Sequence, residues 1–278
     1  MKRGTVGRRY FIVAYTLLAV AALVVAGWLF QRPSAGPQVG VITLSSIING
    51  SSAADVVALL RQAEETPAIR AVVLLIDSPG GSASASEELY LSMLRFREKK
   101  PVVTSVSGIA ASGGYYVASA TDYIYAKPTS FVGSIGAWTF LPQREEVGED
   151  ILPTGPFKAI GGSQRRAAQQ LETVKEGFLD AVIAQRSGKL KLSKEELSQA
   201  ELYMGIEALS LGLVDALGPT TAAVEKAAEL AGISRYDVVD LSPPEDELWF
   251  RLRVEGEERE EFPLQPRFAP EIYFLYFE

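Results

Sequence analysis

The sequence of 278 residues contains no histidine and no cysteine. These two absences exclude a Ser-His-Asp triad, a cysteine nucleophile, a disulfide, an iron–sulfur cluster and a zinc site built from thiolate or imidazole ligands. Acid–base chemistry near neutral pH is therefore left to a carboxylate, a lysine, a tyrosine or an activated water molecule.

Cationic residues are also few, with 27 Lys and Arg against 34 Asp and Glu and a formal net charge of -7. An acidic chain is poorly suited to bind nucleic acid, so we expect no nucleic-acid partner. The composition, 47% apolar and 22% charged, is that of a folded chain with one or two domains and excludes global disorder.

The first thirty residues differ in composition from the rest. Residues 1–9 carry four cationic side chains and no acid, and residues 10–30 form an uncharged apolar run. A helix over 10–30 is about 31 Å long, close to the hydrocarbon thickness of a bilayer. This predicts a single-pass anchor in the cell membrane, with the basic flank in the cytoplasm and the rest of the chain outside it.

Two alternatives to an anchor stay open, namely a cleavable signal peptide and a buried soluble helix. The apolar region of a signal peptide usually runs about 7 to 15 residues and ends in a small-x-small site. Val25-Ala26-Gly27 followed by Trp28 matches such a site poorly.

Residues 31–38 form a short linker. The alternation of apolar and amphipathic stretches after it predicts one domain over residues 39–241, the candidate catalytic domain. Short apolar runs predict strands at 39–44, 71–76, 102–106, 123–126 and 237–241, and amphipathic stretches predict helices at 53–65, 83–99, 111–120, 164–186, 193–201 and 220–231. Such alternation is typical of βαβ units and indicates an α/β fold. The tail, residues 242–278, receives no fold assignment.

Three glycine-containing segments follow predicted strands: residues 77–81 (DSPGG), 107–116 (SGIAASGGYY) and 132–136 (VGSIG). Ligands of open α/β sheets bind beyond the carboxyl ends of strands, and adjacent glycines let backbone N–H groups face an incoming oxygen. Ser112, surrounded by small residues, is a candidate nucleophile. Each segment taken alone also has a purely structural alternative: a turn for residues 77–81, a helix cap for 107–116 and a bend at the edge of the sheet for 132–136.

Without histidine, a serine nucleophile needs another base. A lysine can serve only where an apolar surrounding disfavours its charge. Most lysines lie in charged runs, whereas Lys158 lies in residues 155–162 (GPFKAIGG), with no acid nearer than Asp150. The alternative for Lys158 is an exposed loop lysine.

These motifs, in this order, resemble those of the signal peptide peptidase A family of membrane-anchored serine peptidases. The resemblance covers residues 39–218 and includes Leu211-Gly212-Leu213-Val214-Asp215. It implies an α/β fold of repeated βαβ units, of the crotonase/Clp-protease superfamily. It also implies a Ser-Lys dyad without metal or cofactor, peptide substrates such as remnant signal peptides, and a ring-shaped homo-oligomer.

Carried over by motif, the resemblance assigns five site residues. Ser112 is the expected nucleophile and Lys158 the general base, with Ser134 orienting the lysine amine. The backbone N–H groups of Gly81 and Gly113 are expected to form the oxyanion hole. The dyad can form within one chain or across subunits, because in some relatives its two residues come from different repeats.

Two other functions stay open. One is a crotonase-like acyl-thioester enzyme, which would not need Ser112, and the other is a non-catalytic membrane scaffold of the same fold. The aromatic segment at residues 272–277 also has three possible places: on a neighbouring subunit, on the membrane, or in the substrate groove as a product.

Overall fold

The computed structural model describes residues 14–18, 20–21, 36–141, 154–158, 161–242 and 272–275. The chain divides into two units, Met1–Gly36 and Pro37–Glu278. In the first unit, residues 14–18 and 20–21 are helical and exposed. Most of the anchor predicted over residues 10–30 lies outside the described residues. Among the residues that are described, no helix combines the length and the apolar character needed to cross a bilayer.

The second unit is built on an eight-stranded sheet in the order β10-β1-β2-β4-β5-β9, with β6 paired to β4 and β8 paired to β6. All neighbours are parallel except β6 and β8. The strands are β1 (Gln38–Ser45), β2 (Ile69–Ser78), β4 (Val102–Ala111), β5 (Tyr123–Ala126), β6 (Phe131–Gly133), β8 (Leu202–Met204), β9 (Ala216–Leu217) and β10 (Asp237–Asp240).

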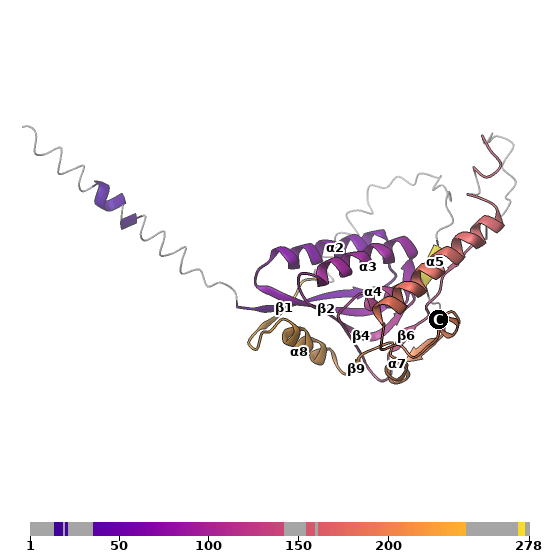
Figure 1. The fold of residues 1–278 in the computed structure, drawn as a ribbon. Coiled ribbons are helices and arrows are strands. Elements are labelled where there is room, and N and C mark those ends of the chain that lie inside the picture. The colour runs from indigo at the N-terminus through magenta and orange to yellow at the C-terminus, as the bar shows by residue number, and fades with distance from the viewer. Residues whose placement is uncertain are drawn as a thin grey trace, which may run out of the picture. The chain divides into compact units, whose positions relative to one another are not determined.

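Helices cover both faces of this sheet (Figure 1). Helices α2 and α3 lie side by side over one face, and α8 lies over the other. The helices are α2 (Gly50–Glu65), α3 (Ala83–Arg97), α4 (Gly113–Ser119), α5 (Gln164–Gln185), α6 (Lys194–Leu197), α7 (Gly205–Leu211) and α8 (Thr220–Leu230).

Strand β2 shows how the sequence builds the two layers. Its side chains alternate between the faces of the sheet. Val72 and Leu74 belong to the large core cluster under α2 and α3, whereas Ala71 and Val73 pack with α8. Because both faces are covered, the strand reads as a nearly continuous apolar run, as expected for a buried parallel strand. This confirms the predicted α/β class.

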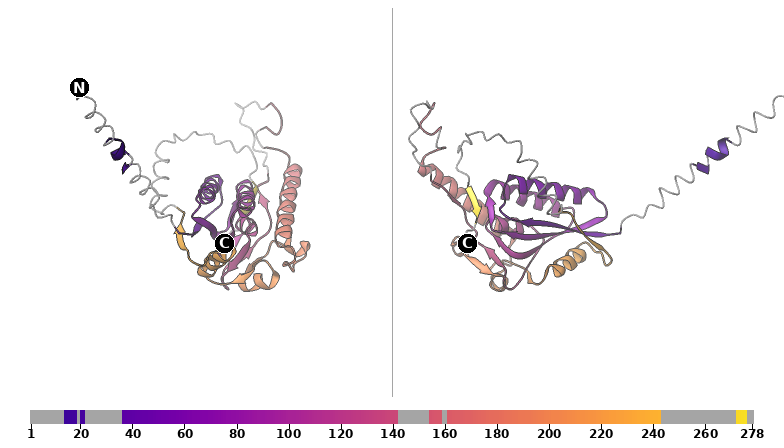
Figure 2. Two further views of the ribbon diagram at one scale, coloured as in Figure 1. Left: turned by 60° about the vertical axis from the view of Figure 1, so that its left-hand side comes forward. Right: turned by 180° about the vertical axis from the view of Figure 1, so that it is seen from behind.

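A second, three-stranded sheet has the order β3-β11-β7. It consists of β3 (Gly80–Ser82), β7 (Trp138–Thr139) and β11 (Ile272–Leu275). Strand β11, drawn in yellow in Figure 2, belongs to the tail that received no fold assignment. Pairing with β3 and β7 therefore places one part of the tail against the domain.

Several predicted boundaries were wrong for local reasons. Helix α2 begins at Gly50 rather than at residue 53, because the Asn49 side chain accepts hydrogen bonds from the N–H groups of Ser51 and Ser52. Strand β4 continues five residues past its predicted end at 106, since its last residues pair with β6. The helix predicted over 193–201 is limited to the single turn of α6.

Candidate active site

The turn between β2 and β3 is held by a buried serine. The Ser78 hydroxyl donates a hydrogen bond to the Ser46 carbonyl (2.5 Å) and accepts one from the Gly80 N–H (3.2 Å). Ser78 is fully buried, and Gly80 has a φ of 103°, a backbone conformation that glycine adopts easily. The Ser78 side chain therefore fixes the direction in which β3 leaves the sheet.

Gly81 lies at the closest backbone approach of this region. The Ile48 N–H donates to the Gly80 carbonyl (2.8 Å), and the Ser82 N–H donates to the Ile48 carbonyl (2.8 Å). A Cβ on Gly81 would lie 1.9 Å from the Ile48 oxygen. Close packing against Ile48 is thus enough to require glycine at position 81. The role of the Gly81 N–H in an oxyanion hole stays a prediction.

Ser112 occupies a strained turn between β4 and α4. Its φ is 52° and its ψ is -119°, and only 2% of the residue is exposed. Such a conformation is costly for a residue with a Cβ, and strained residues of this kind cluster at functional sites. Ser112 is the N-cap of α4, yet its side chain makes no capping hydrogen bond. The helix cap raised by the sequence is therefore confirmed for the position of Ser112, but its hydroxyl does not act as a capping acceptor.

The residues after Ser112 let the first turn of α4 pack closely against β2. A Cβ on Gly114 would lie 2.8 Å from the Ser78 carbonyl oxygen. The N–H of Gly113 belongs to the first turn of α4, where backbone donors have no partner within the helix. This places a backbone donor directly after Ser112, as an oxyanion site requires.

Ser134 lies beside Ser112 because of the pairing of β4 with β6. The parallel register places Ala111 opposite Gly133, and the Ser112 N–H donates to the Gly133 carbonyl (2.8 Å). Ser134, the next residue, also has a positive φ of 53°. Its N–H donates to the Glu201 carbonyl (2.8 Å). The structure thus brings the two predicted serines to neighbouring positions at one edge of the sheet.

Lys158 makes no hydrogen bond to Ser112 or Ser134 within the single chain. It lies in a turn at residues 154–158, where its N–H donates to the Gly155 carbonyl (3.1 Å), and its side chain is exposed. Among the described residues, its amine makes no hydrogen bond or ion pair. Residues 142–153 and 159–160 on either side lie outside the described part. The role of Lys158 as base remains a prediction.

Asp77 positions the segment of β4 that leads to Ser112, a role for which the sequence gave no assignment. Its Oδ1 accepts a hydrogen bond from the Ile109 N–H (3.0 Å). A Cβ on Gly108 would lie 2.5 Å from the same oxygen. The Ser107 hydroxyl adds a bond to the Ile76 carbonyl (3.1 Å). The acidic residue at the start of the DSPGG segment was the only sequence signal for this role. Its partner, the Ile109 N–H, lies 32 residues further along the chain and could not be identified from the sequence.

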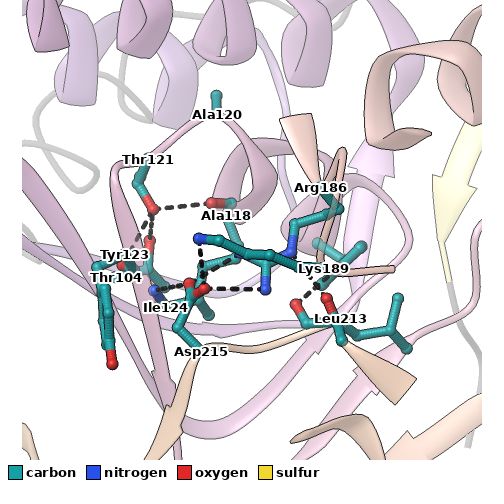
Figure 3. Close-up of polar contacts among 12 residues, drawn as sticks. Thr104, Ala118, Ala120, Thr121, Tyr123, Ile124, Arg186, Lys189, Leu213 and Asp215 are labelled. Carbon is teal, nitrogen blue, oxygen red and sulfur yellow. Dashed lines mark hydrogen bonds and ion pairs between the residues drawn. The ribbon is translucent and has the colours of Figure 1, made fainter. Parts of the chain in front are cut away.

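A buried ion pair joins Arg186, at the end of α5, to Asp215, the residue before β9 (Figure 3). Arg186 binds both carboxylate oxygens of Asp215, at 2.8 and 3.1 Å, and Lys189 adds a contact of 2.6 Å to Oδ1. The Ile124 N–H also donates to this carboxylate (2.8 Å). Burial favours the neutral acid, but the hydrogen bonds and charge of Arg186 outweigh it, so the pKa of Asp215 lies below its usual value.

The same region anchors Tyr115 of α4. The Tyr115 hydroxyl donates to the Leu213 carbonyl (2.7 Å), and burial raises the pKa of this phenol well above its usual value. Leu213 lies two residues before Asp215, and both belong to the late motif at residues 211–215. The late motif is thus structural, since it fixes the helix that follows the candidate nucleophile.

Two family models and several known proteases match this domain. A family model described as peptidase family S49 matches residues 95–234, and one described as Clp protease matches residues 37–131. Protease 4 of Salmonella typhi is 33% identical over 191 residues, which cover 64% of this chain and 31% of that protein. The chloroplastic serine protease SPPA of Arabidopsis thaliana is 31% identical over 207 residues, which cover 68% of this chain and 30% of that protein.

A solved structure supports the fold independently. It is a mutant of the membrane-bound stomatin-specific protease 1510-N in complex with a substrate peptide, and it is 17% identical to this chain. The superposition has a TM-score of 0.57 and covers 80% of this chain and 99% of that one. This likeness confirms a Clp-protease-like α/β fold.

The chain spans less than a third of the length of each of the two relatives named above. The S49 model nevertheless matches half of this chain, and its match includes Ser112, Ser134 and Lys158. The chain therefore belongs to peptidase family S49, the signal peptide peptidase A family of serine peptidases.

Proposed function

We propose that the chain is a serine endopeptidase in which Ser112 is the nucleophile and the neutral amine of Lys158 is the general base. The observation that carries this proposal is the geometry of Ser112. The residue is buried and strained, its hydroxyl caps no helix, and it lies next to Ser134. A serine held in a strained strand-to-helix turn is a recurring arrangement for a nucleophile.

In the proposed reaction, the Ser112 oxygen attacks the carbonyl carbon of a peptide bond while its proton passes to the amine of Lys158. The N–H groups of Gly81 and Gly113 stabilise the negative charge that develops on the carbonyl oxygen. The protonated amine then gives its proton to the leaving amine, which leaves an acyl-enzyme on Ser112. Water activated by the same base hydrolyses this ester and restores the serine.

Ser134 is proposed to orient the lysine amine. Its position after β6 is fixed by two backbone bonds, from Ser112 to Gly133 and from Ser134 to Glu201. The carbonyl of Glu201 lies so close to Gly133 that a Cβ there would approach it to 2.6 Å. The backbone that carries Ser134 is therefore rigid, as a positioning residue requires.

We propose that the lysine reaches Ser112 across a subunit boundary of a ring-shaped homo-oligomer. The support is the exposed side chain of Lys158 in the isolated chain, together with the buried position of Ser112. A neighbouring subunit that covers the site would also remove water from the amine, which favours its neutral form.

Apolar peptides, such as remnant signal peptides, are the proposed substrates. Exposed apolar side chains gather in the segments beside the site, with Phe131 on β6 and Phe140 and Leu141 directly after β7. A groove of 720 Å³ also adjoins β3 between α2 and α3, and its lining includes Ile47, Ala53, Val57 and Ser82. Apolar walls of this kind fit apolar peptide side chains.

The N-terminal anchor completes the proposal and has its own test. An apolar anchor over residues 10–30 would hold the domain at the extracytoplasmic surface of the cell membrane, next to cleaved signal peptides. Protease added outside intact cells should then digest the domain and leave residues 1–9 protected. Digestion of residues 1–9 in intact cells would contradict this topology.

A peptidase assay tests the chemistry. Detergent-solubilised protein should cleave an apolar fluorogenic peptide, and Ser112→Ala should lower the rate at least about 1,000-fold. Lys158→Ala should do the same, whereas Ser187→Ala and Lys191→Ala, at exposed positions outside the proposed site, should leave the rate unchanged. Peptide cleavage that survives Ser112→Ala would contradict the Ser-Lys dyad, and wild-type protein that cleaves no peptide would favour the acyl-thioester enzyme or the non-catalytic scaffold.

A further inference from the structure

Strand β4 contains a bulge directly before the segment that leads to Ser112. Its pairing with β2 is regular as far as Val106, which lies opposite Ile76, and the register shifts after this pair. At the shift, β2 contributes the single residue Asp77 and β4 contributes residues 107–109. Bulges bend the strand that carries the additional residues, and beside active sites they redirect a side chain.

The bulge lies where β4 changes its partner on the other edge. Residues 103–106 pair with β5, and residues 109–111 pair with β6. The second pairing is the one that holds Ser112 beside Ser134, through the bond from the Ser112 N–H to the Gly133 carbonyl (2.8 Å). The direction in which β4 leaves the bulge therefore determines whether Ser112 reaches its strained turn.

The side chain of Asp77 occupies the bulge. Its Oδ1 accepts the hydrogen bond from the Ile109 N–H (3.0 Å). The carboxylate lies so close to Gly108 that a Cβ there would be 2.5 Å from Oδ1 and 3.1 Å from Oδ2. Gly108 does not have a left-handed backbone, so the constraint at this position is one of space. The carboxylate and the bulge therefore fit each other only while residue 108 has no side chain.

The backbone of Asp77 is fixed from the opposite edge of β2. Ser45 of β1 lies opposite Asp77 in the parallel register, and the Ser46 N–H donates to the Asp77 carbonyl (3.1 Å). The next residue, Ser78, is fully buried and donates to the Ser46 carbonyl. A carboxylate on a backbone held in this way is a rigid acceptor, as a group that positions another residue requires.

We propose that Asp77 is a positioning residue for peptide cleavage, whose carboxylate holds the bulge of β4 in the shape that brings Ser112 into its strained turn. This inference rests on the proposed function, because positioning changes a rate only if Ser112 attacks peptides. Asp77 is exposed, so water and salt screen its charge. The carboxylate therefore acts as a hydrogen-bond acceptor for a backbone amide, and its charge is not required.

Two substitutions separate the acceptor from the charge in the peptidase assay. Asp77→Asn keeps Oδ1 and loses the charge, so kcat should stay within about threefold of the wild-type value. Asp77→Ala removes the acceptor and should lower kcat about 100-fold, the cost of a displacement of about 1 Å at a reacting group. KM should change less than about twofold in both, because the partner of Asp77 is backbone and not substrate. Asp55→Ala, at an exposed acid on α2, is the control and should keep the wild-type rate. A wild-type kcat in Asp77→Ala, an equal loss in Asp77→Asn, or a change confined to KM would overturn the proposal.

Thermal unfolding tests the contact between the carboxylate and Gly108 without requiring activity. Gly108→Ala forces a Cβ against the Asp77 carboxylate and should lower the unfolding midpoint by about 5 °C. The same change in the Asp77→Ala protein should lower the midpoint by less than about 2 °C, because the clashing carboxylate is absent. Equal shifts in the two backgrounds would show that the carboxylate does not occupy the bulge and would overturn the proposal.

Amide hydrogen exchange separates this inference from the proposed function. Exchange at residues 107–111, measured by mass spectrometry, should be about fivefold faster in Asp77→Ala than in the wild-type protein and unchanged in Asp77→Asn. Faster exchange with no cleavage by any protein would support the hold of Asp77 on the bulge and contradict the peptidase. Cleavage that depends on Ser112 but is unchanged in Asp77→Ala would support the peptidase and contradict the positioning role.

Discussion

Ser112 and Ser134 follow two neighbouring parallel strands at the same register, and both have left-handed backbones, with φ of 52° and 53°. A hydrogen bond from the Ser112 N–H to the Gly133 carbonyl links the two turns directly. Neither conformation is favourable for a residue with a Cβ. The strain is maintained by strand pairing on one side and by α4 on the other.

The first prediction follows from this strain. Ser112→Gly should raise the free energy of unfolding by about 1 kcal/mol, because glycine adopts a positive φ at little cost. The same change should abolish peptide cleavage. Thermal unfolding and the peptidase assay together check both effects. Ser198→Gly, at a φ of -69°, is the control and should give no stabilisation. A destabilised Ser112→Gly protein would contradict the account of strain.

The second prediction concerns Ser134 as a positioning residue. Ser134→Ala should lower kcat by about 10- to 100-fold, the range for one hydrogen bond to a group that becomes charged. KM should change little, because the hydroxyl is proposed to contact the lysine rather than the substrate. Ser134→Thr should restore part of the rate. A change confined to KM would show instead that Ser134 contacts substrate.

The third prediction concerns the hydroxyl of Ser78. Ser78→Ala removes the bonds to the Ser46 carbonyl and the Gly80 N–H in a fully buried position. We expect a loss of about 1 to 3 kcal/mol in the free energy of unfolding and slower formation of the acyl-enzyme. Ser84→Ala changes a serine whose hydroxyl bond is exposed and should lose less than about 0.5 kcal/mol. Equal losses would contradict the role given to Ser78.

The fourth prediction concerns the buried pair of Arg186 and Asp215. Arg186→Met leaves the carboxylate without its main partner and should cost about 3 to 5 kcal/mol. Lys189→Met removes only the exposed partner and should cost less than about 1 kcal/mol. Chemical denaturation measures both. Equal costs would show that the buried partner is not the dominant one.

The pH dependence of stability has a defined sign at this pair. The pKa of Asp215 is lower in the folded state than in the unfolded chain, so ionisation of the carboxylate favours folding. This contribution is complete above the unfolded pKa of about 4 and is lost as the pH falls through the folded pKa. Asp215→Asn should therefore flatten the acid side of the stability profile. An unchanged acid side would contradict the assignment.

The fifth prediction separates a dyad within one chain from one across subunits. Ser112→Ala and Lys158→Ala chains are mixed, dissociated and reassembled. If the lysine comes from a neighbouring subunit, about a quarter of the sites in random rings contain both intact residues, so about a quarter of the activity returns. No recovery, with mixed rings confirmed by mass, would place both residues in one chain.

Much of the central sheet was predictable from the sequence because its strands are buried on both faces. The apolar runs of β2 and β4 and the amphipathic pattern of α3 follow directly from this burial. The glycines at 81 and 114 also signalled close backbone approach, and the structure shows the partners at Ile48 and Ser78.

The features that were missed depend on contacts between distant segments. The positive φ of Ser112 arises from the pairing of β4 with β6, and β6 is too short to be predicted from three residues. The pairing of β11 depends on β3 and β7, which are distant in the sequence, so no local pattern in the tail indicates it. The exposed side chain of Lys158 agrees instead with the alternative of a loop lysine, because small and apolar residues in a turn do not by themselves create a pocket.

The covalent intermediate proposed on Ser112 can be trapped and located by mass spectrometry. The protein is incubated with a serine-reactive fluorophosphonate and digested, and the modified peptide is sequenced. We expect one adduct, on Ser112, which is absent from the Ser112→Ala protein and from the Lys158→Ala protein. An adduct on another residue, or none from protein that cleaves peptides, would contradict it.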